Sequence, residues 1–396
     1  MPFRDAEKKV LRDGMRPLLA VCGFMSLAFA LFVVGIAVLL FIIRRIRGDR
    51  LRALIEREAR TVLSHVTLPP PGTKGVVMCA GGRYLGEAFA SITMLRASGS
   101  KLPVCIVHAG PEEVEEVHRH IFRKAFGDSV FFKDATTFDL GVRPHKLQGF
   151  EIKPYALLLS PFQHTLLLDA DCSTVGPDPA SLFKEHAYRE YGNIFWPDFA
   201  VSNELVRPWM IGTYVKTQVS SGFETESGQI VVNVQRCIRG LVYSWLLNKH
   251  SDVFYSCYYG DKDLFRIGWL MAGLPFYQVP WSPGLVGNED DTYGIYLNSM
   301  IQKHPCHGTP LFAHRTMHKR LTHTPEWTVY VPNDGELGTR TTLRWPEFNH
   351  GSCLDGLRWQ LRPSPPAWVR MGRAIREAEE TFAARSESPE LLLPKH

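Results

Sequence analysis

His164-Thr-Leu-Leu-Leu-Asp-Ala-Asp-Cys-Ser173 is the part of the sequence from which the predicted architecture follows. Its leucine run shows no polar alternation, so it predicts a short buried strand over Thr165–Leu168 that is covered on both faces. Asp169 and Asp171 come next, at the carboxyl end of this strand, where open α/β sheets bind their ligands. Two carboxylates separated by one small residue can hold one hard divalent cation. We therefore predict a metal site here, with a solvated turn as the alternative.

A strand, a glycine turn and a helix open the globular part of the sequence. Gly75–Met78 is an apolar run, Cys79-Ala80-Gly81-Gly82 follows it, and apolar residues then recur at helical spacing over Tyr84–Ala97. Glycines let the backbone come close to a ligand, so the candidate nucleotide contacts in this turn are Ala80, Gly81 and Gly82. The turn does not match the dinucleotide fingerprint Gly-x-Gly-x-x-Gly, and a simple tight turn is the alternative.

Further strands and helices alternate along the chain, which predicts an α/β fold. The predicted strands are Pro103–His108, Val130–Phe132, Asn193–Trp196, Ile230–Asn233 and Gly273–Val279. The predicted helices are Pro111–Phe126, Pro154–Ser160, Asp178–Tyr191, Cys237–His250, Gly260–Ala272 and Pro365–Arg385. Lys153 directly precedes the helix that leads into the central strand, close enough to the acid pair to reach a diphosphate; a solvated lysine is the alternative.

An apolar segment near the amino terminus predicts a membrane anchor. Residues 17–43 carry no charge, and this length is sufficient for a helix that crosses a bilayer with some tilt. The run is longer than a signal-peptide core, which favours an uncleaved anchor, with a buried core helix as the alternative. The predicted divisions are a cytosolic tail at 1–16, the anchor at 17–43, a stem at 44–73, a catalytic domain at 74–363 and a C-terminal helix and tail at 364–396.

The composition is that of a globular protein with one apolar insertion, since 45% of the 396 residues are hydrophobic and 21% are charged. The net charge is +5, and the excess is local, because arginines crowd residues 44–60 directly after the apolar segment. We interpret this charge as membrane-proximal and not as a nucleic-acid face, and no nucleic-acid-binding motif is present. Both flanks of the predicted anchor are basic, so the positive-inside rule does not decide its orientation.

The chain has eight cysteines, of which Cys22 lies in the predicted anchor. An odd number remains outside it, so at least one thiol is unpaired unless it bonds another chain. The cysteine spacing fits no zinc pattern. A lumenal location would allow disulfides, whose connectivity the sequence does not give.

A series of motifs resembles the fungal-type α-1,3-mannosyltransferases of glycosyltransferase family 71. The motifs are Gly75-Val-Val-Met-Cys-Ala-Gly-Gly-Arg-Tyr84, Lys153-Pro-Tyr-Ala-Leu-Leu-Leu-Ser-Pro-Phe162, Leu168-Asp-Ala-Asp171, Phe195-Trp-Pro-Asp-Phe199, Glu226-Ser-Gly-Gln229, Gly260-Asp-Lys262 and Leu311-Phe-Ala-His-Arg315. Their order and spacing match the family over residues 74–320, which is most of the globular part.

This resemblance implies a GT-A fold, a mixed sheet with helices on both faces, preceded by one transmembrane helix. It implies a single-pass type II Golgi membrane protein with a lumenal catalytic domain. The expected donor is GDP-mannose, with Mn²⁺ or Mg²⁺ as the cofactor, a glycan or glycoprotein as the acceptor, and retention of the anomeric configuration. Asp169 and Asp171 match the family's metal-binding pair. His314 falls where related retaining enzymes place a late histidine that completes the metal shell.

Further residues receive roles from the same resemblance and from their charge. Besides Asp169, the charged residues expected to contact the nucleotide sugar are Lys153, Lys262 and Arg315, because charge-assisted bonds suit phosphate oxygens. The candidate catalytic acids are Asp261, Glu226 and Asp198, the first two by similarity to the residues that line the donor sugar in glycogenin-like enzymes. A helix N-cap is the alternative for Asp261, a surface acid for Glu226 and a structural histidine for His314.

Two alternatives concern the function as a whole. The donor could be a UDP-sugar, as in glycogenin-like families. The chain could instead be a non-catalytic membrane scaffold, and the retained set Asp169, Asp171 and His314 argues against this. Neither the linkage nor the oligomeric state is predicted from these motifs.

Overall fold

The computed structural model describes residues 46–147, 149–201, 223–256, 258, 260–281, 283–290, 294–315, 328–332, 359–363 and 366–387, and four single positions between 33 and 39. The chain divides into two compact units, Met1–Leu54 and Ile55–His396. In the first unit, residues 46–54 are helical. The second unit contains both sheets.

The predicted membrane anchor at 17–43 falls almost entirely outside the described residues. The exceptions are Val33, Val34, Ile36 and Leu39, whose side chains are exposed. Among the residues that the structure describes, no helix combines the length and the apolarity needed to cross a bilayer. The anchor therefore stays a prediction from the sequence.

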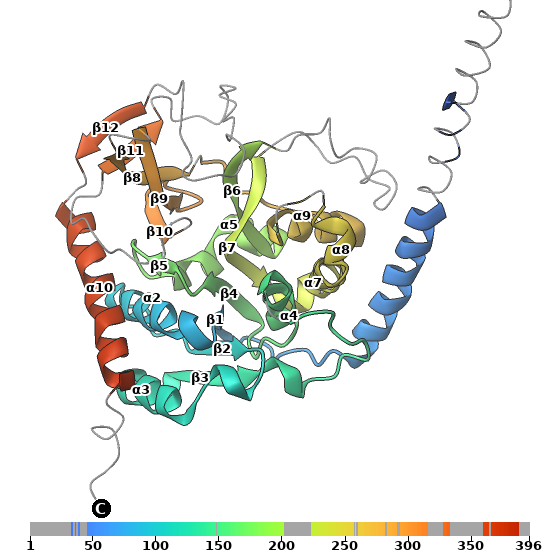
Figure 1. Cartoon of the computed structure of the whole chain (residues 1–396), viewed down its shortest axis with the longest axis horizontal. Helices are drawn as coiled ribbons and strands as arrows, with labels where there is room; N and C mark the ends of the chain where they lie inside the picture. Colours follow the sequence, from blue (N-terminus) through green and yellow to red (C-terminus); the bar gives the residue numbers. More distant parts are fainter. Residues whose placement is uncertain are drawn as a thin grey trace, which may run out of the picture. The chain divides into compact units, whose positions relative to one another are not determined.

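A six-stranded mixed sheet forms the centre of the second unit (Figure 1). Its strand order is β3 (Val130–Asp134), β2 (Val104–His108), β1 (Lys74–Cys79), β4 (His164–Asp169), β7 (Phe223–Asn233) and β6 (Asn193–Val201). The first four strands are mutually parallel, and β7 is antiparallel to both β4 and β6. Leu166, Leu167 and Leu168 of β4 are fully buried, which confirms the predicted central strand.

A second six-stranded sheet was not predicted. It runs in the order β12 (Trp359–Pro363), β11 (Thr328–Pro332), β8 (Gly284–Asp290), β9 (Gly294–Lys303), β10 (Pro310–His314) and β5 (Cys172–Thr174). All its neighbouring strands are antiparallel. Strand β5 begins directly after the acid pair, so the chain passes from the first sheet to the second through Asp169-Ala-Asp171.

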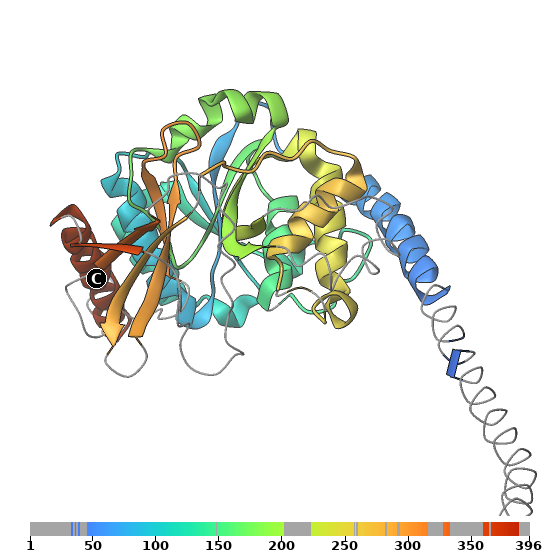
Figure 2. The ribbon, with the colours of Figure 1, turned by 90° about the horizontal axis from the view of Figure 1, so that it is seen from above.

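Helices cover both faces of the first sheet, as Figures 1 and 2 show. The described helices are α2 (Leu85–Ala97), α3 (Glu116–Phe126), α4 (Ile152–Leu158), α5 (His186–Tyr191), α7 (Val234–Lys249), α8 (Ser251–Phe254), α9 (Lys262–Ala272) and α10 (Pro366–Glu387). Short 3₁₀ turns lie at Gly82–Tyr84, Pro111–Glu113, Gly127–Ser129, Ala135–Thr137, Gly149–Glu151 and Pro179–Lys184. Val76 and Met78 share one apolar cluster with α2, α3 and α10, so the alternating Val77 faces the other side, where α4 packs against β1.

Several predicted elements differ from the observed ones. Of the predicted strand Gly273–Val279, only an isolated bridge between Phe195 and Gln278 is present. The predicted helix Asp178–Tyr191 is interrupted at Glu185, whose backbone is extended (φ −62°, ψ 144°), and separates into a 3₁₀ turn and α5. The apolar spacing did not predict this break, because a single residue with extended backbone angles is enough to interrupt a helix.

The ends of the second unit take part in its core. Residues 55–65 are helical, and Ile55, Ala59 and Val62 in this helix are buried. Glu58 of the same helix binds Lys249 of α7, with 2.6 Å between Oε1 and Nζ. Residues 55–65, which lie in the predicted stem, therefore pack on the globular part of the protein.

The carboxyl-terminal helix α10 contributes one aromatic side chain to the core. The ring of Phe382 lies 5.6 Å from that of Phe89 and 5.7 Å from that of Phe122, measured between centroids. We expect Phe382→Ala to lower the free energy of unfolding by about 3 kcal/mol, because it leaves a cavity between α10, α2 and α3. Urea unfolding of the full chain measures this change. Thr381→Ala, on the exposed side of the same helix, is the matched control, and an equal loss in the control would contradict the assigned packing.

Candidate metal and nucleotide site

The acid pair lies where the two sheets join. Asp169 is the last residue of β4 and pairs in register with Cys79, the last residue of β1. Asp171 is 5% exposed, and after it the chain enters β5. Both carboxylates therefore lie at the carboxyl edge of the parallel strands, as the sequence predicted.

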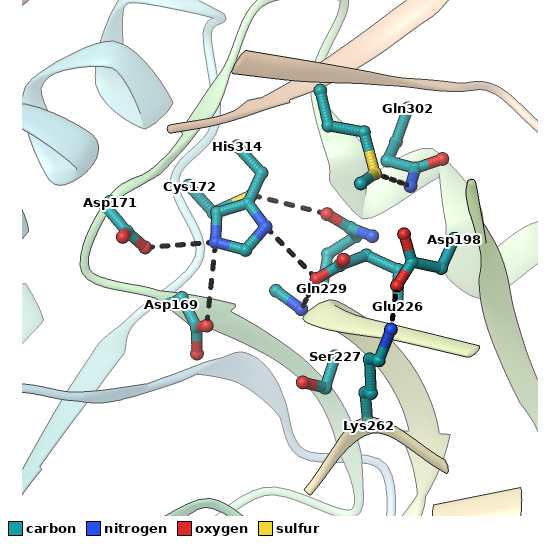
Figure 3. A network of polar contacts seen from close by, with 12 residues as sticks. Asp169, Asp171, Cys172, Asp198, Glu226, Ser227, Gln229, Lys262, Gln302 and His314 are labelled. Atoms are coloured by element: carbon teal, nitrogen blue, oxygen red, sulfur yellow. Dashed lines mark hydrogen bonds and ion pairs between the residues drawn. The ribbon is translucent and has the colours of Figure 1, made fainter. Parts of the chain in front are cut away.

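Strand β10 brings the predicted histidine to this pair. The antiparallel pairing of β10 with β5 sets His314 opposite Cys172. His314 Nε2 lies 3.3 Å from Asp171 Oδ1 and 3.8 Å from Asp169 Oδ2 (Figure 3). One ligand atom from each of the three side chains lies within 4.8 Å of the others. Two carboxylates and one imidazole form a donor set that suits Mn²⁺.

The other nitrogen of the His314 ring faces Glu226 of β7. Nδ1 lies 3.1 Å from Glu226 Oε1, and the same oxygen accepts a 2.6 Å hydrogen bond from the backbone N–H of Gly228. The ring also packs on Gly228, where an added Cβ would lie 2.5 Å from Nδ1. These contacts fix the ring so that Nε2 points toward the acids. In metalloproteins, a carboxylate that holds the second nitrogen of a histidine ligand has this function.

The charges of the three groups depend on one another. Burial raises the pKa of Asp169 to about 6 in spite of the nearby Lys153. Burial alone would also raise the pKa of Glu226, but His314 and the Gly228 N–H lower it to about 2. Burial would lower the pKa of His314, yet Glu226 and Asp171 raise it well above its usual value. An imidazolium thus supplies positive charge to the acids, and a divalent cation could take the place of its Nε2 proton.

Lys153 of α4 connects the acid pair to Asp261. Its Nζ lies 2.6 Å from Asp169 Oδ2, 3.2 Å from Ser227 Oγ and 3.5 Å from Asp261 Oδ2. Burial would lower the pKa of Lys153, but Asp169 and Asp261 raise it above its usual value. Asp261 is 2% exposed and precedes α9, yet its side chain makes no capping hydrogen bond. The structure therefore does not support the N-cap alternative for Asp261, and its site role stays a prediction.

Asp198 and Lys262 form a second charged group. Lys262 Nζ binds Asp198 of β6 and lies 2.9 Å from Oε2 of Glu224 on β7. Burial would lower the pKa of Lys262, but these two acids raise it. Glu224 was not predicted, although its spacing of two residues from Glu226 puts both on the same face of β7.

The remaining predicted contacts have structural partners. An added Cβ on Gly81 would lie 2.3 Å from Glu113 Oε2, and Gly82 has a positive φ of 52°, so a close contact favours glycine at the first position and the backbone conformation favours it at the second. The backbone N–H of Ala80 donates to Val107 O at 3.1 Å. Arg315 is 1% exposed and its guanidinium pairs with Glu379 of α10. The nucleotide contacts predicted for these residues therefore stay predictions.

Comparison with known proteins places the chain in a family. The family described as "Mannosyltransferase putative" matches residues 73–221 and 215–307, which together are more than half of the chain. The chain belongs to this mannosyltransferase family. This confirms the mannosyltransferase resemblance of the sequence motifs.

Fungal proteins similar in sequence to this chain are named as mannosyltransferases. Alpha-1,2-mannosyltransferase MNN22 of Candida albicans is 26% identical over 309 residues, which cover 67% of this chain and 51% of the relative. Alpha-1,2-mannosyltransferase MNN2 of Saccharomyces cerevisiae is 25% identical over 310 residues, which cover 63% of this chain and 52% of the relative. The chain thus spans about half the length of the relatives that it matches.

Among solved structures, the galactosyltransferase LgtC in complex with donor and acceptor sugar analogues covers 52% of this chain. The match covers 73% of LgtC, with 16% identity and a TM-score of 0.38. At this score the likeness supports no conclusion about the fold.

The contact of Glu226 with His314 leads to a metal-binding prediction. We expect Glu226→Gln to weaken Mn²⁺ binding by about 10–100-fold, because the His314 ring loses the carboxylate that orients it. Isothermal titration of the full chain measures the affinity. Glu224→Gln is the matched control, since it lies on the same strand but binds Lys262. Unchanged Mn²⁺ affinity in Glu226→Gln would contradict the positioning role.

The contact of Gly228 with the same ring leads to a second prediction. In Gly228→Ala the new methyl group displaces the imidazole from Asp171, because a carbon cannot approach Nδ1 to 2.5 Å. We expect weaker Mn²⁺ binding and a lower melting temperature. Gly86→Ala in α2 is the control, since its added Cβ would make an ordinary 3.4 Å contact with Phe382. Equal behaviour of the two variants would show that the ring position is not limited by Gly228.

Proposed function

We propose that this protein is a metal-dependent glycosyltransferase of the GT-A type that transfers mannose from GDP-mannose to a glycan or glycoprotein acceptor with retention of configuration. One observation carries the proposal: Asp169, Asp171 and His314 converge at the carboxyl edge of the central sheet of a chain that belongs to a mannosyltransferase family.

Each charged residue of the site has a part in the proposed reaction. Asp169, Asp171 and His314 would hold Mn²⁺ or Mg²⁺, and Glu226 would keep the His314 ring in position. The bound cation supplies positive charge for the diphosphate that leaves the sugar. Lys153, whose Nζ lies 2.6 Å from Asp169 Oδ2, is the candidate for a further charge-assisted bond to a phosphate oxygen.

Asp261 is the acid that we place next to the reacting sugar. Its Oδ2 is buried, has no hydrogen-bond partner among the described residues and faces Lys153 at 3.5 Å. A buried carboxylate oxygen without a hydrogen bond costs free energy, unless a group of a bound ligand donates a hydrogen bond to it. Asp261 therefore suits either attack on the anomeric carbon or stabilisation of the positive charge that develops there. Asp198 is bound to Lys262, and Glu226 to His314, which makes both weaker candidates for this role.

The relatives guide the proposal on donor and linkage. Their names specify mannosyl transfer, which supports mannose over another hexose. The names do not give the nucleotide, and we propose GDP because the motif resemblance implies it. The relatives reported above are named for α-1,2 transfer, whereas the family that the motifs resemble is named for α-1,3 transfer. We propose an α-mannosyl linkage, and analysis of the product distinguishes the two positions.

The membrane location is part of the proposal. The uncharged segment at 17–43 supports a single membrane-spanning anchor. The type II orientation, with the catalytic part in the Golgi lumen, is proposed from the motif resemblance alone, because both flanks of the segment are basic.

Thermal unfolding of the full chain with Mn²⁺ and either GDP or UDP tests the function. A ligand that binds only the folded state raises the melting temperature by mass action. We expect a rise with GDP and Mn²⁺ that is lost in Asp171→Ala and kept in Asp128→Ala, a variant of an exposed acid. A rise with UDP alone would replace GDP-mannose by a UDP-sugar. No rise with either nucleotide would contradict an enzyme that uses nucleotide sugars.

A further inference from the structure

A second group of metal-ligating side chains lies outside the site described above. One ligand atom each from Glu185, His304 and Cys306 lies within 4.8 Å of the others. Cys306 Sγ donates a 2.6 Å hydrogen bond to Glu185 Oε2, and His304 Nε2 lies 3.7 Å from Oε1 of the same carboxylate. Strand β10 begins after this group and ends at His314, so the length of the strand, roughly 14 Å at about 3.4 Å per residue, separates the group from the acid pair.

The backbone holds these residues in place. His304 and Cys306 lie in the turn that connects β9 to β10, which is closed by a 2.7 Å bond from His304 N–H to Thr309 O and a 3.0 Å bond from Gly308 N–H to His304 O. Gly308 has a positive φ of 65°. Glu185 lies at the break before α5, makes no capping hydrogen bond there, and reaches the turn instead. The convergence therefore depends on the interrupted helix and the tight turn together.

We propose that Glu185, His304 and Cys306 bind a transition-metal ion of the zinc type, separate from the cation of the acid pair. A thiolate and an imidazole with one carboxylate are donors that Zn²⁺ prefers, whereas Mn²⁺ and Mg²⁺ prefer oxygen. His304 is 3% exposed, and exposed Cys306 gives the ion access to the group. The fourth position is open to water or to His307, whose ring stacks on that of His304 with centroids 4.7 Å apart.

Metal binding releases the thiol proton of Cys306 and moves the ring proton of His304 from one nitrogen to the other. The Cys306 thiol proton, now donated to Glu185, passes to solvent as the sulfur–metal bond forms. The Cys306 N–H donates to His304 Nδ1 at 3.3 Å, so in the neutral ring the proton is on Nε2. Coordination through Nε2 moves this proton to Nδ1 and gives up that long hydrogen bond. One weak hydrogen bond is a small loss beside bonds from a metal to thiolate and imidazole.

A metal at this position would tie the β9–β10 turn to the start of α5. The turn leads directly into β10, which carries His314 at its far end. The second metal would thus have a structural role, and its presence does not depend on the proposed mannosyl transfer.

Titration of the full chain with Co²⁺, after purification without reductant or chelating resin, tests the proposal. Cobalt bound to a thiolate gives a sulfur-to-metal charge-transfer absorption band, which the oxygen and nitrogen ligands of the acid pair cannot give. We expect this band to grow to a constant intensity as Co²⁺ is added. We expect it to disappear in Cys306→Ser and to persist in Asp171→Asn. We expect Glu185→Gln to weaken the binding by more than about tenfold.

Two results would overturn the proposal. One is the absence of the band in the wild-type chain, which is also the result expected if Cys306 is engaged in a disulfide. The other is a band of unchanged intensity in Cys306→Ser, which would assign the metal to another thiol. Glu185→Gln leaves the cysteine in place. A weaker affinity of this variant for Co²⁺ therefore shows the loss of a metal ligand, independently of any misfolding of Cys306→Ser.

Discussion

The pairing of β10 with β5 is the contact on which the candidate site depends. The acids and the histidine lie far apart in the sequence, and only the register of these two short strands sets His314 opposite Cys172, beside Asp171. The backbone N–H of Arg315 extends this connection with a 3.1 Å bond to Asp171 O. If the strands slipped by one residue, the imidazole would face the opposite side of the sheet and the metal-ligating set would be lost.

Charge compensation explains why the rest of the site is arranged around this contact. Several acids are buried here, and removing the partner of one buried charge typically costs about 3–5 kcal/mol. Lys153 compensates Asp169 and Asp261, His314 compensates Asp171 and Glu226, and Lys262 compensates Asp198 and Glu224. These pairs keep the side chains in position before any ligand binds, so little reorganisation is required when a metal and a diphosphate enter.

The sequence predicted what depends on local pattern and missed what depends on long-range pairing. The apolar run before Asp169 and the strand–glycine–helix unit over Gly75–Ala97 specify their own conformations, and both are confirmed by β4, β1 and α2. The second sheet was missed because only β8, β9 and β10 follow closely on one another along the chain, whereas β5, β11 and β12 join them from distant parts of the sequence. The contact of Glu226 with His314 was missed for the same reason, since β7 and β10 belong to different sheets and no periodicity links them.

Pulsed electron paramagnetic resonance of Mn²⁺ bound to the full chain with GDP tests the central claim most directly. A nitrogen atom bound to the metal modulates the electron spin echo, and His314 is the only nitrogen ligand in the proposed set. The account predicts modulation by directly bound nitrogen in the wild-type chain and its loss in His314→Ala. Mn²⁺ that binds together with GDP but shows no bound nitrogen would contradict the claim that β10 completes the metal site.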